Sequence, residues 1–231
     1  MKKAFLILFF AFFVATADAH FFVGPQAGFS VATLKKTTYT VSSKFGYHGG
    51  LMANFSLSDH VGIMGGILYS TKGFKYDFTT GTTSSQVDTN GNNATVDVNF
   101  TANVDAVLGY LDFPLMLTLY SGETKGLFIQ AGPQFSYLIS SNSNLATATT
   151  LNVNTGSNSP VTPITDATLD FHKADIAFIG GIGYKFPSFL LVYARAATAL
   201  LKVQDGTLVK DENYGRNFAI EVGVAMTLGG K

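Results

Sequence analysis

Alternation of apolar and polar residues between Asp105 and Tyr137 constrains the fold more than any other feature of the sequence. In the first arm of this stretch, every second residue is apolar or glycine: Val107, Gly109, Leu111, Phe113, Leu115, Leu117 and Leu119. After a polar turn, a second arm repeats the pattern with Leu127, Ile129, Ala131, Phe135 and Tyr137. A period of two over about ten residues is typical of transmembrane β-strands, whose apolar side faces lipid and whose polar side faces the lumen. The stretch therefore predicts a membrane-crossing hairpin.

The same pattern recurs along the chain and predicts eight strands. They are residues 22–33, 45–57 and 61–78, the two arms of the 105–137 hairpin, and residues 171–186, 189–203 and 217–228. An open sheet would leave unpaired backbone groups in lipid, so the first strand must pair with the last. We therefore expect an all-β fold, a transmembrane antiparallel up-and-down β-barrel of eight strands.

The connections between these strands alternate in length. Residues 35–44, 79–102, 140–170 and 204–216 form long polar segments, whereas Ser58–His60, Ser121–Lys125 and Pro187–Ser188 are short turns. Barrels of this class have short periplasmic turns and longer extracellular loops. The alternation thus predicts an outer-membrane location, with both termini in the periplasm and the long segments outside the cell. Asn90-Gly91 is a strong hairpin signal and indicates strands that extend beyond the membrane there.

The N-terminus resembles a cleaved secretory signal peptide. Lys2 and Lys3 precede a short apolar run at residues 4–15, and Ala17-Asp18-Ala19 supplies small residues for cleavage after Ala19. The apolar run is too short for a spanning helix, which needs about 20 residues. Because the chain has no cysteine, a lipid-anchored N-terminus is excluded. We expect residues 1–19 to be a signal peptide and residues 20–231 to form the barrel domain.

Composition separates the barrel from water-soluble alternatives. Charged residues make up 13% of the chain, against about 25% in ordinary soluble domains. A soluble sandwich or lipocalin-type barrel can also alternate, but it would usually carry more charge on its outward face. Loss of Lys2, Lys3 and Asp18 from a chain with 15 basic and 15 acidic residues leaves 13 basic and 14 acidic residues. That balance gives no reason to expect a nucleic-acid partner.

Several polar residues occupy the lumen-facing positions of the predicted strands. They are Asp112, Gln130, Gln134, Asp175, Lys185, Arg195 and Glu221. They could line a gated polar path, but a narrow barrel fills its interior with side chains, and buried charges must be paired. We therefore expect a structural network, in which Arg195 and Glu221 are partners on adjacent strands and Asp112 and Asp175 are second choices for Arg195.

Catalytic, cofactor-binding and metal sites are not expected. The four histidines are scattered, and no two have metal-ligand spacing. An outer-leaflet lipid-modifying enzyme would pair a histidine with a serine, and His172 has the right height in the predicted barrel. However, Ala174 stands where the serine is expected, so the base has no nucleophile. We expect a protein that is not an enzyme.

Two short motifs resemble the PorT-like outer-membrane β-barrel family. They are ILYSTKG at residues 67–73 and YLDFPLML at residues 110–117, and GGIGYKF at residues 180–186 is also similar. The resemblance implies the barrel fold and, from the member that names the family, a component of a protein-secretion or envelope machine. The residues themselves favour a structural or interaction role through the outward loops. Expected partners are outer-membrane lipid, the barrel-assembly machinery, and an envelope or extracellular protein.

Overall fold

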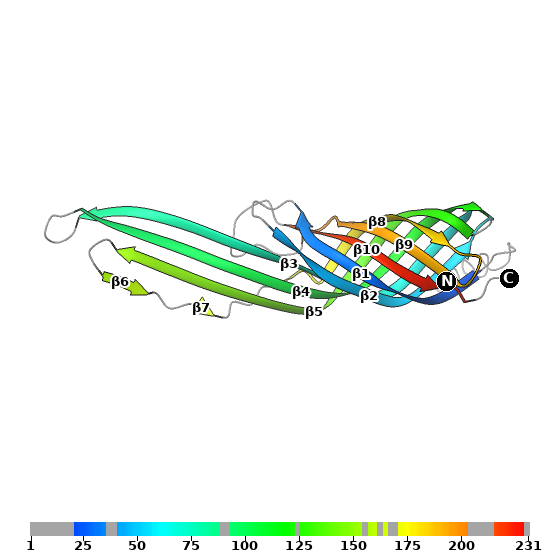
Figure 1. Ribbon diagram of the computed structural model, residues 1–231, viewed down its shortest axis with the longest axis horizontal. Coiled ribbons are helices and arrows are strands. Elements are labelled where there is room, and N and C mark those ends of the chain that lie inside the picture. The colour runs from blue at the N-terminus through cyan, green and yellow to red at the C-terminus, as the bar shows by residue number, and fades with distance from the viewer. Residues whose placement is uncertain are drawn as a thin grey trace, which may run out of the picture.

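Eight antiparallel strands close into a barrel (Figure 1). The computed structural model describes residues 21–35, 41–87, 93–122, 125–153, 157–160, 164–165, 171–202 and 215–228. The barrel strands are β1 (Phe21–Lys35), β2 (Val41–Ser56), β3 (Val61–Val87), β4 (Asn93–Gly122), β5 (Lys125–Val153), β8 (Ala174–Lys185), β9 (Leu190–Ala199) and β10 (Arg216–Met226). β1 pairs with β10 in the register Phe29↔Val222, which closes the ring. The predicted eight-stranded fold is confirmed.

The outer wall of the barrel is apolar, and its inner wall is packed. On β1, outward residues such as Phe29 are exposed, whereas inward residues such as Phe22, Gln26 and Ser30 are buried. β9 and β10 alternate in the same way because successive side chains of a strand point to opposite faces. Among the described residues there is no helix that is long and apolar enough to cross a membrane.

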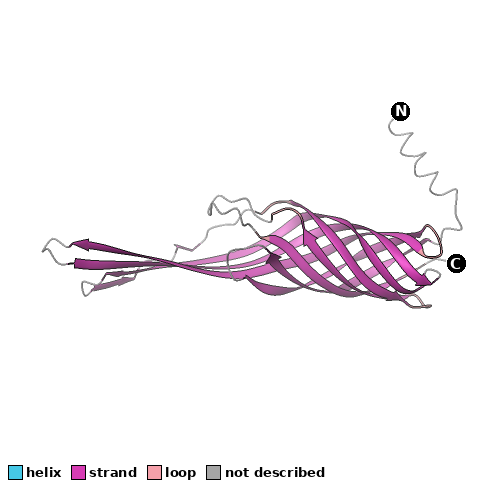
Figure 2. Cartoon of the chain, turned by 90° about the horizontal axis from the view of Figure 1, so that it is seen from above, coloured by secondary structure: helices cyan, strands magenta, loops and turns pink. Residues whose placement is uncertain are grey.

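Three strands continue well beyond the barrel and form a sheet of their own (Figures 1 and 2). β2 pairs with β3 only as far as Val41↔Tyr76, but β3 and β4 stay paired without a register shift to Val87↔Asn93. β5 pairs with β4 out to Val96↔Val153. We call residues 77–87, 93–103 and 146–153 the extension. At about 3.3 Å per residue, its eleven-residue edge on β3 spans about 35 Å.

Two short strands complete the opposite edge of the extension. β6 (Ser157–Pro160) pairs with the end of β5 through Val153↔Ser157, and β7 (Ile164–Thr165) pairs with Ala146 and Thr147. Both lie beside β5 in the plane of the sheet rather than across one of its faces. The extension therefore has three long strands and a partial fourth.

The long polar segments at 79–102 and 140–170 are not the loops that their composition predicts. β3 and β4 occupy most of the first segment, and β5 runs to Val153 in the second. Threonine and valine favour strands, and each strand here finds a partner on at least one edge. The predicted polar segments at 35–44 and 204–216 are also shorter than expected, because β2 begins at Val41 and β10 at Arg216. The hairpin tip at Asn90-Gly91, residues 1–19 and most of 204–216 lie outside the described residues.

Candidate functional site

The polar residues predicted for the lumen lie on its inner wall, most of them deeply buried. Asp112 is 1% exposed, Arg195 2% and Glu221 3%, and Gln130, Gln134 and Asp175 are also buried. Lys185 is half-buried near the end of β8, with its ammonium 3.9 Å from the centre of the Phe22 ring. These side chains therefore occupy the interior of the barrel.

Lys72 also belongs to this network, although it is not among the residues predicted for it from the sequence. Its ammonium donates to Asp112 Oδ1 at 3.1 Å and to the Ser136 hydroxyl at 3.5 Å. The Ser70 hydroxyl donates to the other Asp112 oxygen at 2.6 Å. Ser70 and Lys72 come from the ILYSTKG motif and Asp112 from YLDFPLML, which pair directly through Leu68↔Asp112 and Ser70↔Tyr110. The sequence contained a signal for this residue. Lys72 lies eight residues after the inward residue Met64 on the same strand, and an even spacing places both on the same face.

Arg195 and Glu221 lie directly opposite each other on β9 and β10. Within the described part of the chain, however, no ion pair of 4 Å or less joins them. Arg195 instead donates to the Gln26 side-chain oxygen at 3.4 Å, and its guanidinium centre is 3.8 Å from the centre of the Tyr193 ring. Arg195 also donates to the Met64 sulfur at 3.5 Å, so the predicted strand neighbours are adjacent but the close contacts of the arginine are to other residues.

The other lumen residues form smaller groups. Asn217 donates to Asp175 Oδ2 at 3.4 Å, and Gln134 donates to the Ser136 hydroxyl at 3.3 Å. Both polar atoms of the Gln130 amide are buried without a hydrogen-bond partner among the described residues. The residues predicted from the sequence therefore fall into separate groups. Asp112 and Gln134 belong to the group around Lys72, Asp175 contacts Asn217, and Arg195 faces Glu221. The other predicted residues lie outside these groups.

Apolar clusters lie on both sides of the polar layer along the barrel. Toward the end that carries the short turns, the cluster contains Phe22, Met52, Met64, Met116, Tyr120, Phe128, Ile179, Leu191, Tyr193, Ala197 and Ala225. Toward the extension, it contains Phe74, Val104, Ala106, Leu108 and Tyr110, with Leu34, Val41, Leu138 and Phe171 packed against it. Along β3, the inward order Met64, Leu68, Ser70, Lys72, Phe74 shows the layering. At the short-turn end, buried polar side chains such as Asn54, Thr118 and Gln130 lie among the apolar ones.

Hydrolytic or metal chemistry finds no support in these groups. Within the described ranges, no three His, Asp or Glu side chains gather as metal ligands. His48 is buried in the lumen, and its Nε2 hydrogen-bonds the Tyr193 hydroxyl at 2.7 Å. His172, the histidine considered for lipid chemistry, is exposed just before β8. The buried groups are suited to holding the strands in register.

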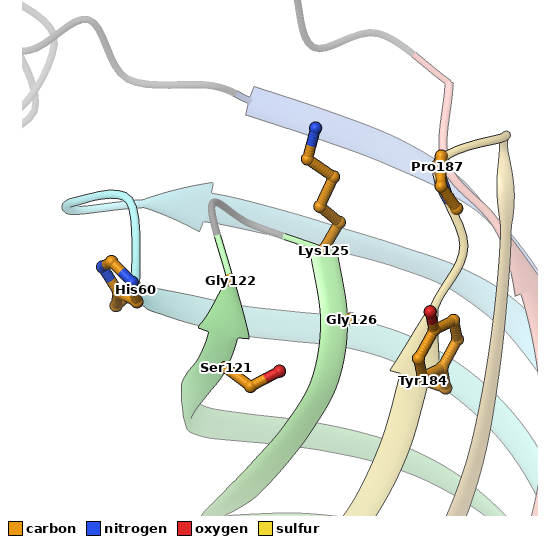
Figure 3. Close-up of a pocket in the computed structure, with 7 residues that line it drawn as sticks. All are labelled: His60, Ser121, Gly122, Lys125, Gly126, Tyr184 and Pro187. Atoms are coloured by element: carbon orange, nitrogen blue, oxygen red, sulfur yellow. The ribbon is translucent and has the colours of Figure 1, made fainter.

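A hollow lies at the rim with the short turns (Figure 3). It is lined by His60, Ser121, Gly122, Lys125, Gly126, Tyr184 and Pro187. Gly126 has a φ of 87°, a left-handed conformation that glycine adopts at little cost in a hairpin turn. In Figure 3 the side chains of His60, Lys125 and Tyr184 stand apart rather than around one point. The hollow follows from the turn geometry and shows no convergent binding groups.

The pairing register gives the extension two unlike faces. On one face, the rows across β3, β4 and β5 are Phe78–Ala102–Thr147, Thr80–Phe100–Thr149, Thr82–Val98–Leu151 and Ser84–Val96–Val153. We call these rows the apolar face, and none of their residues is charged. The rows of the other face are Asp77–Asn103–Ala146, Thr79–Thr101–Ala148, Gly81–Asn99–Thr150 and Thr83–Asp97–Asn152. The pairing register therefore places both aspartates of these rows, Asp77 and Asp97, in the second set.

Comparisons with known proteins agree with the barrel. A family model described as "Outer membrane protein beta-barrel domain" matches residues 16–205. Among solved structures, Neisserial surface protein A is 13% identical, with 91% of this chain and 99% of that chain covered and a TM-score of 0.38. Ail, the attachment invasion locus protein of Yersinia pestis, is 11% identical, with coverages of 90% and 99% and a TM-score of 0.34. The N-terminal β-barrel domain of Pseudomonas aeruginosa OprF is 12% identical, with coverages of 89% and 97% and a TM-score of 0.31. The search of curated proteins finds no match.

Proposed function

The chain belongs to the family of outer membrane protein β-barrel domains, and we propose that it acts as a non-enzymatic interaction protein, whose extension binds an envelope or extracellular protein partner outside the cell. In this proposal the barrel anchors the chain in the outer membrane and the extension is the binding part. Residues 1–19 direct export and are removed, and the barrel-assembly machinery inserts residues 20–231.

The observation that carries this proposal is the continuation of β3, β4 and β5 beyond the barrel. The apolar band on the outside of β4 ends at Val107, and the next outward residues are Asp105 and Asn103. An anchor alone needs strands of about ten residues. β3 and β4 have 27 and 30 residues, so much of each strand lies outside any lipid layer. A sheet of this length in water offers surface for recognition.

The proposed orientation follows from the same asymmetry. At the end away from the extension, β2 and β3 are joined by residues 57–60, and β8 and β9 by residues 186–189. Short turns of this kind are periplasmic in the class, whereas long projections are extracellular. The described part of the chain begins with β1 and ends after β10 at this same end, where Val23 forms a bridge with Leu228. We therefore propose a periplasmic location for the termini and an extracellular one for the extension.

The filled lumen supports a role other than transport or catalysis. Eight strands enclose an interior that is only wide enough for side chains. Here the buried Lys72–Asp112 pair and the apolar clusters at both ends occupy that interior. The role that remains for the barrel is to hold the extension in the membrane.

A second candidate function follows from the PorT-like motifs, which imply a component of a secretion or envelope machine. The two motifs are adjacent on β3 and β4 and supply Ser70, Lys72 and Asp112 to the lumen. Packing inside the barrel is enough to explain these motifs. They are therefore stronger evidence for the barrel fold than for a role in a secretion or envelope machine. In that candidate the partner would bind the periplasmic turns rather than the extension.

Site-specific photo-cross-linking in intact cells distinguishes these candidates. A photoreactive amino acid at Thr82 or Thr83 lies on the extension, one at Asp59 lies in a short turn, and one at Leu117 faces lipid as a control. The proposed function predicts protein adducts from Thr82 or Thr83 and none from Leu117. Adducts from Asp59 alone would favour the envelope-machine candidate. Absence of adducts from both extension positions would contradict the proposed function.

A further inference from the structure

One long edge of the extension has no neighbouring strand in the described part of the chain. β2 pairs with β3 only as far as Val41↔Tyr76, and no described strand pairs with that side of β3 beyond Tyr76. In Figure 1, β3 forms one border of the extension, and no labelled strand lies along it there. The opposite border, on β5, is partly covered by β6 and β7 of the same chain. We call the outer edge of residues 77–87 the open edge.

Two hydrogen bonds show which backbone groups point toward the open edge. The Tyr120 N–H donates to the carbonyl of His60, the residue before β3, at 2.8 Å. The Leu57 N–H donates to the Val61 carbonyl at 2.8 Å. Because the backbone groups of successive residues point to opposite sides of a strand, even-numbered residues of β3 face β4 and odd-numbered residues face β2. The β3–β4 register stays constant to the end of β3, so the same alternation continues through the extension.

Beyond the end of β2, exposed odd-numbered residues of β3 direct their backbone groups toward the open edge. They include Asp77, Thr79 and Gly81, whose N–H and C=O groups point away from β4. Natural edge strands are usually protected by lysine, proline or a bulge. Residues 77–87 contain neither lysine nor proline, Asp77 is their one charged residue, and their pairing with β4 has no register shift. The open edge is therefore suited to accept another strand.

We propose that the open edge binds an extended segment of the partner protein, which adds to the extension as a further strand. This inference rests on the proposed function and names the chemistry of its ligand. An extended main chain presents N–H and C=O groups at the same spacing as the open edge, whereas a proline would remove a donor. The ligand is therefore a proline-free segment of about ten residues in the β conformation, matched to the length of the edge.

A second copy of this chain in the same membrane does not fit the open edge. Both extensions would project in the same direction, so the two β3 strands would be parallel. A two-fold axis along that direction would place each residue opposite its own copy, with N–H facing N–H and C=O facing C=O. The segment that binds therefore belongs to a different protein.

Amide exchange of the full chain in lipid nanodiscs tests whether the open edge is available. By NMR, the amide protons of Thr79 and Gly81 should exchange at least about tenfold faster than those of Phe78 and Thr80, whose N–H groups face β4. Equal protection of the two pairs would mean that the chain itself covers the edge, and it would overturn the proposal.

A second test removes single donors from the open edge. Proline is tolerated in an edge strand where the lost N–H faces away from the sheet. Thr79→Pro and Gly81→Pro should therefore keep the β3–β4 pairing, which continued protection of the Thr80 amide verifies. Thr79→Ala and Gly81→Ala are matched controls, because they change the side chain and keep the N–H.

The readout is the yield of protein adducts in intact cells from a photoreactive amino acid at Thr82 or Thr83. We expect either proline variant to lower the yield at least about tenfold, and either alanine variant to leave it unchanged, because the main chain makes the contact. Equal yields in the proline and alanine variants would overturn strand addition, and adducts that persist in both would leave the proposed function intact. Absence of adducts from both positions in the natural sequence would contradict the proposed function itself.

Discussion

Lys72 and Asp112 form a buried ion pair across the adjacent strands β3 and β4, with Nζ 3.1 Å from Oδ1. Both side chains are almost fully buried, and Ser70 and Ser136 complete the hydrogen bonds of the pair. Because the two residues belong to strands that also form the extension, the pair fixes the base from which the extension projects.

Removal of one partner of this pair should destabilise the barrel. Lys72→Met keeps the apolar stem but leaves Asp112 buried without its cation, and we expect a loss of about 3–5 kcal/mol in the free energy of unfolding. The double variant Lys72→Met with Asp112→Leu should lose less, since no unpaired charge remains. Reversible urea unfolding in lipid vesicles measures both. A double variant less stable than Lys72→Met would show that the pair itself stabilises the barrel.

Arg195 should also stabilise the barrel, although its close contacts differ from the predicted ones. Arg195→Leu removes the cation opposite Glu221 and leaves the side-chain oxygen of Gln26 without its donor, and we expect a loss of about 1–3 kcal/mol in the free energy of unfolding. Ala196→Leu is the matched control, because Ala196 faces outward and a leucine side chain is compatible with lipid there. The same unfolding assay applies. Unchanged stability in Arg195→Leu would mean that its burial has no energetic consequence.

The sealed lumen predicts no stable porin-like conductance. The purified chain in planar bilayers should show at most rare, brief openings, because buried inward side chains occupy the interior of the barrel. A variant shortened at 79–102 and 140–170 should behave in the same way, since the seal lies within the barrel. Sustained channels of porin size in the shortened variant would contradict the filled interior.

Asp105 should make the base of the extension sensitive to strong acid. It lies beyond the apolar band, and the hydrogen bond from the Lys44 side chain, with help from Lys75, holds the pKa of its carboxyl below the ordinary value. A lowered pKa stabilises the folded form above the unfolded pKa of about 3.9, and that contribution disappears as the pH falls through the folded pKa. Proteolysis of the extension in vesicles should therefore accelerate below about pH 4.

Asp105→Asn provides the control for this pH dependence. It removes the ionisable group, so its extension should be cleaved at a more uniform rate across the same pH range, and faster than the natural chain at neutral pH. If the acid-induced acceleration were the same in Asp105→Asn and in the natural chain, another group would be responsible.

The sequence predicted the barrel well because the lipid-facing residues impose a period of two along most of each barrel strand. Phe29, Leu115 and Val222 are outward for that reason, and the alternation also identified Arg195 and Glu221 as inward neighbours. Contacts across the lumen could not be predicted, because they join strands that are far apart in the ring. The approach of Arg195 to Gln26 depends on strand tilt and shear, which no local pattern encodes.

The extension was predicted only in part, for a different reason. Residues 79–102 are rich in Thr, Asn, Gly and Ser, which suggests a loop, and only Asn90-Gly91 indicated longer strands. Threonine is nevertheless a good strand residue, and Val96, Val98 and Phe100 continue the alternation of β4. The residues of β5 after Ser140 gave a weaker signal, because their strand character depends on pairing with β4.

Surface labelling of single cysteines tests the central claim, that the barrel presents the extension outside the cell. The chain has no cysteine of its own, so Thr79→Cys and Asp59→Cys report separately on the extension and on a short turn, both at exposed positions. A membrane-impermeant maleimide added to intact cells should label Thr79→Cys and should reach Asp59→Cys only after the outer membrane is permeabilised. Labelling of Asp59→Cys in intact cells with protection of Thr79→Cys would reverse the orientation and contradict the account.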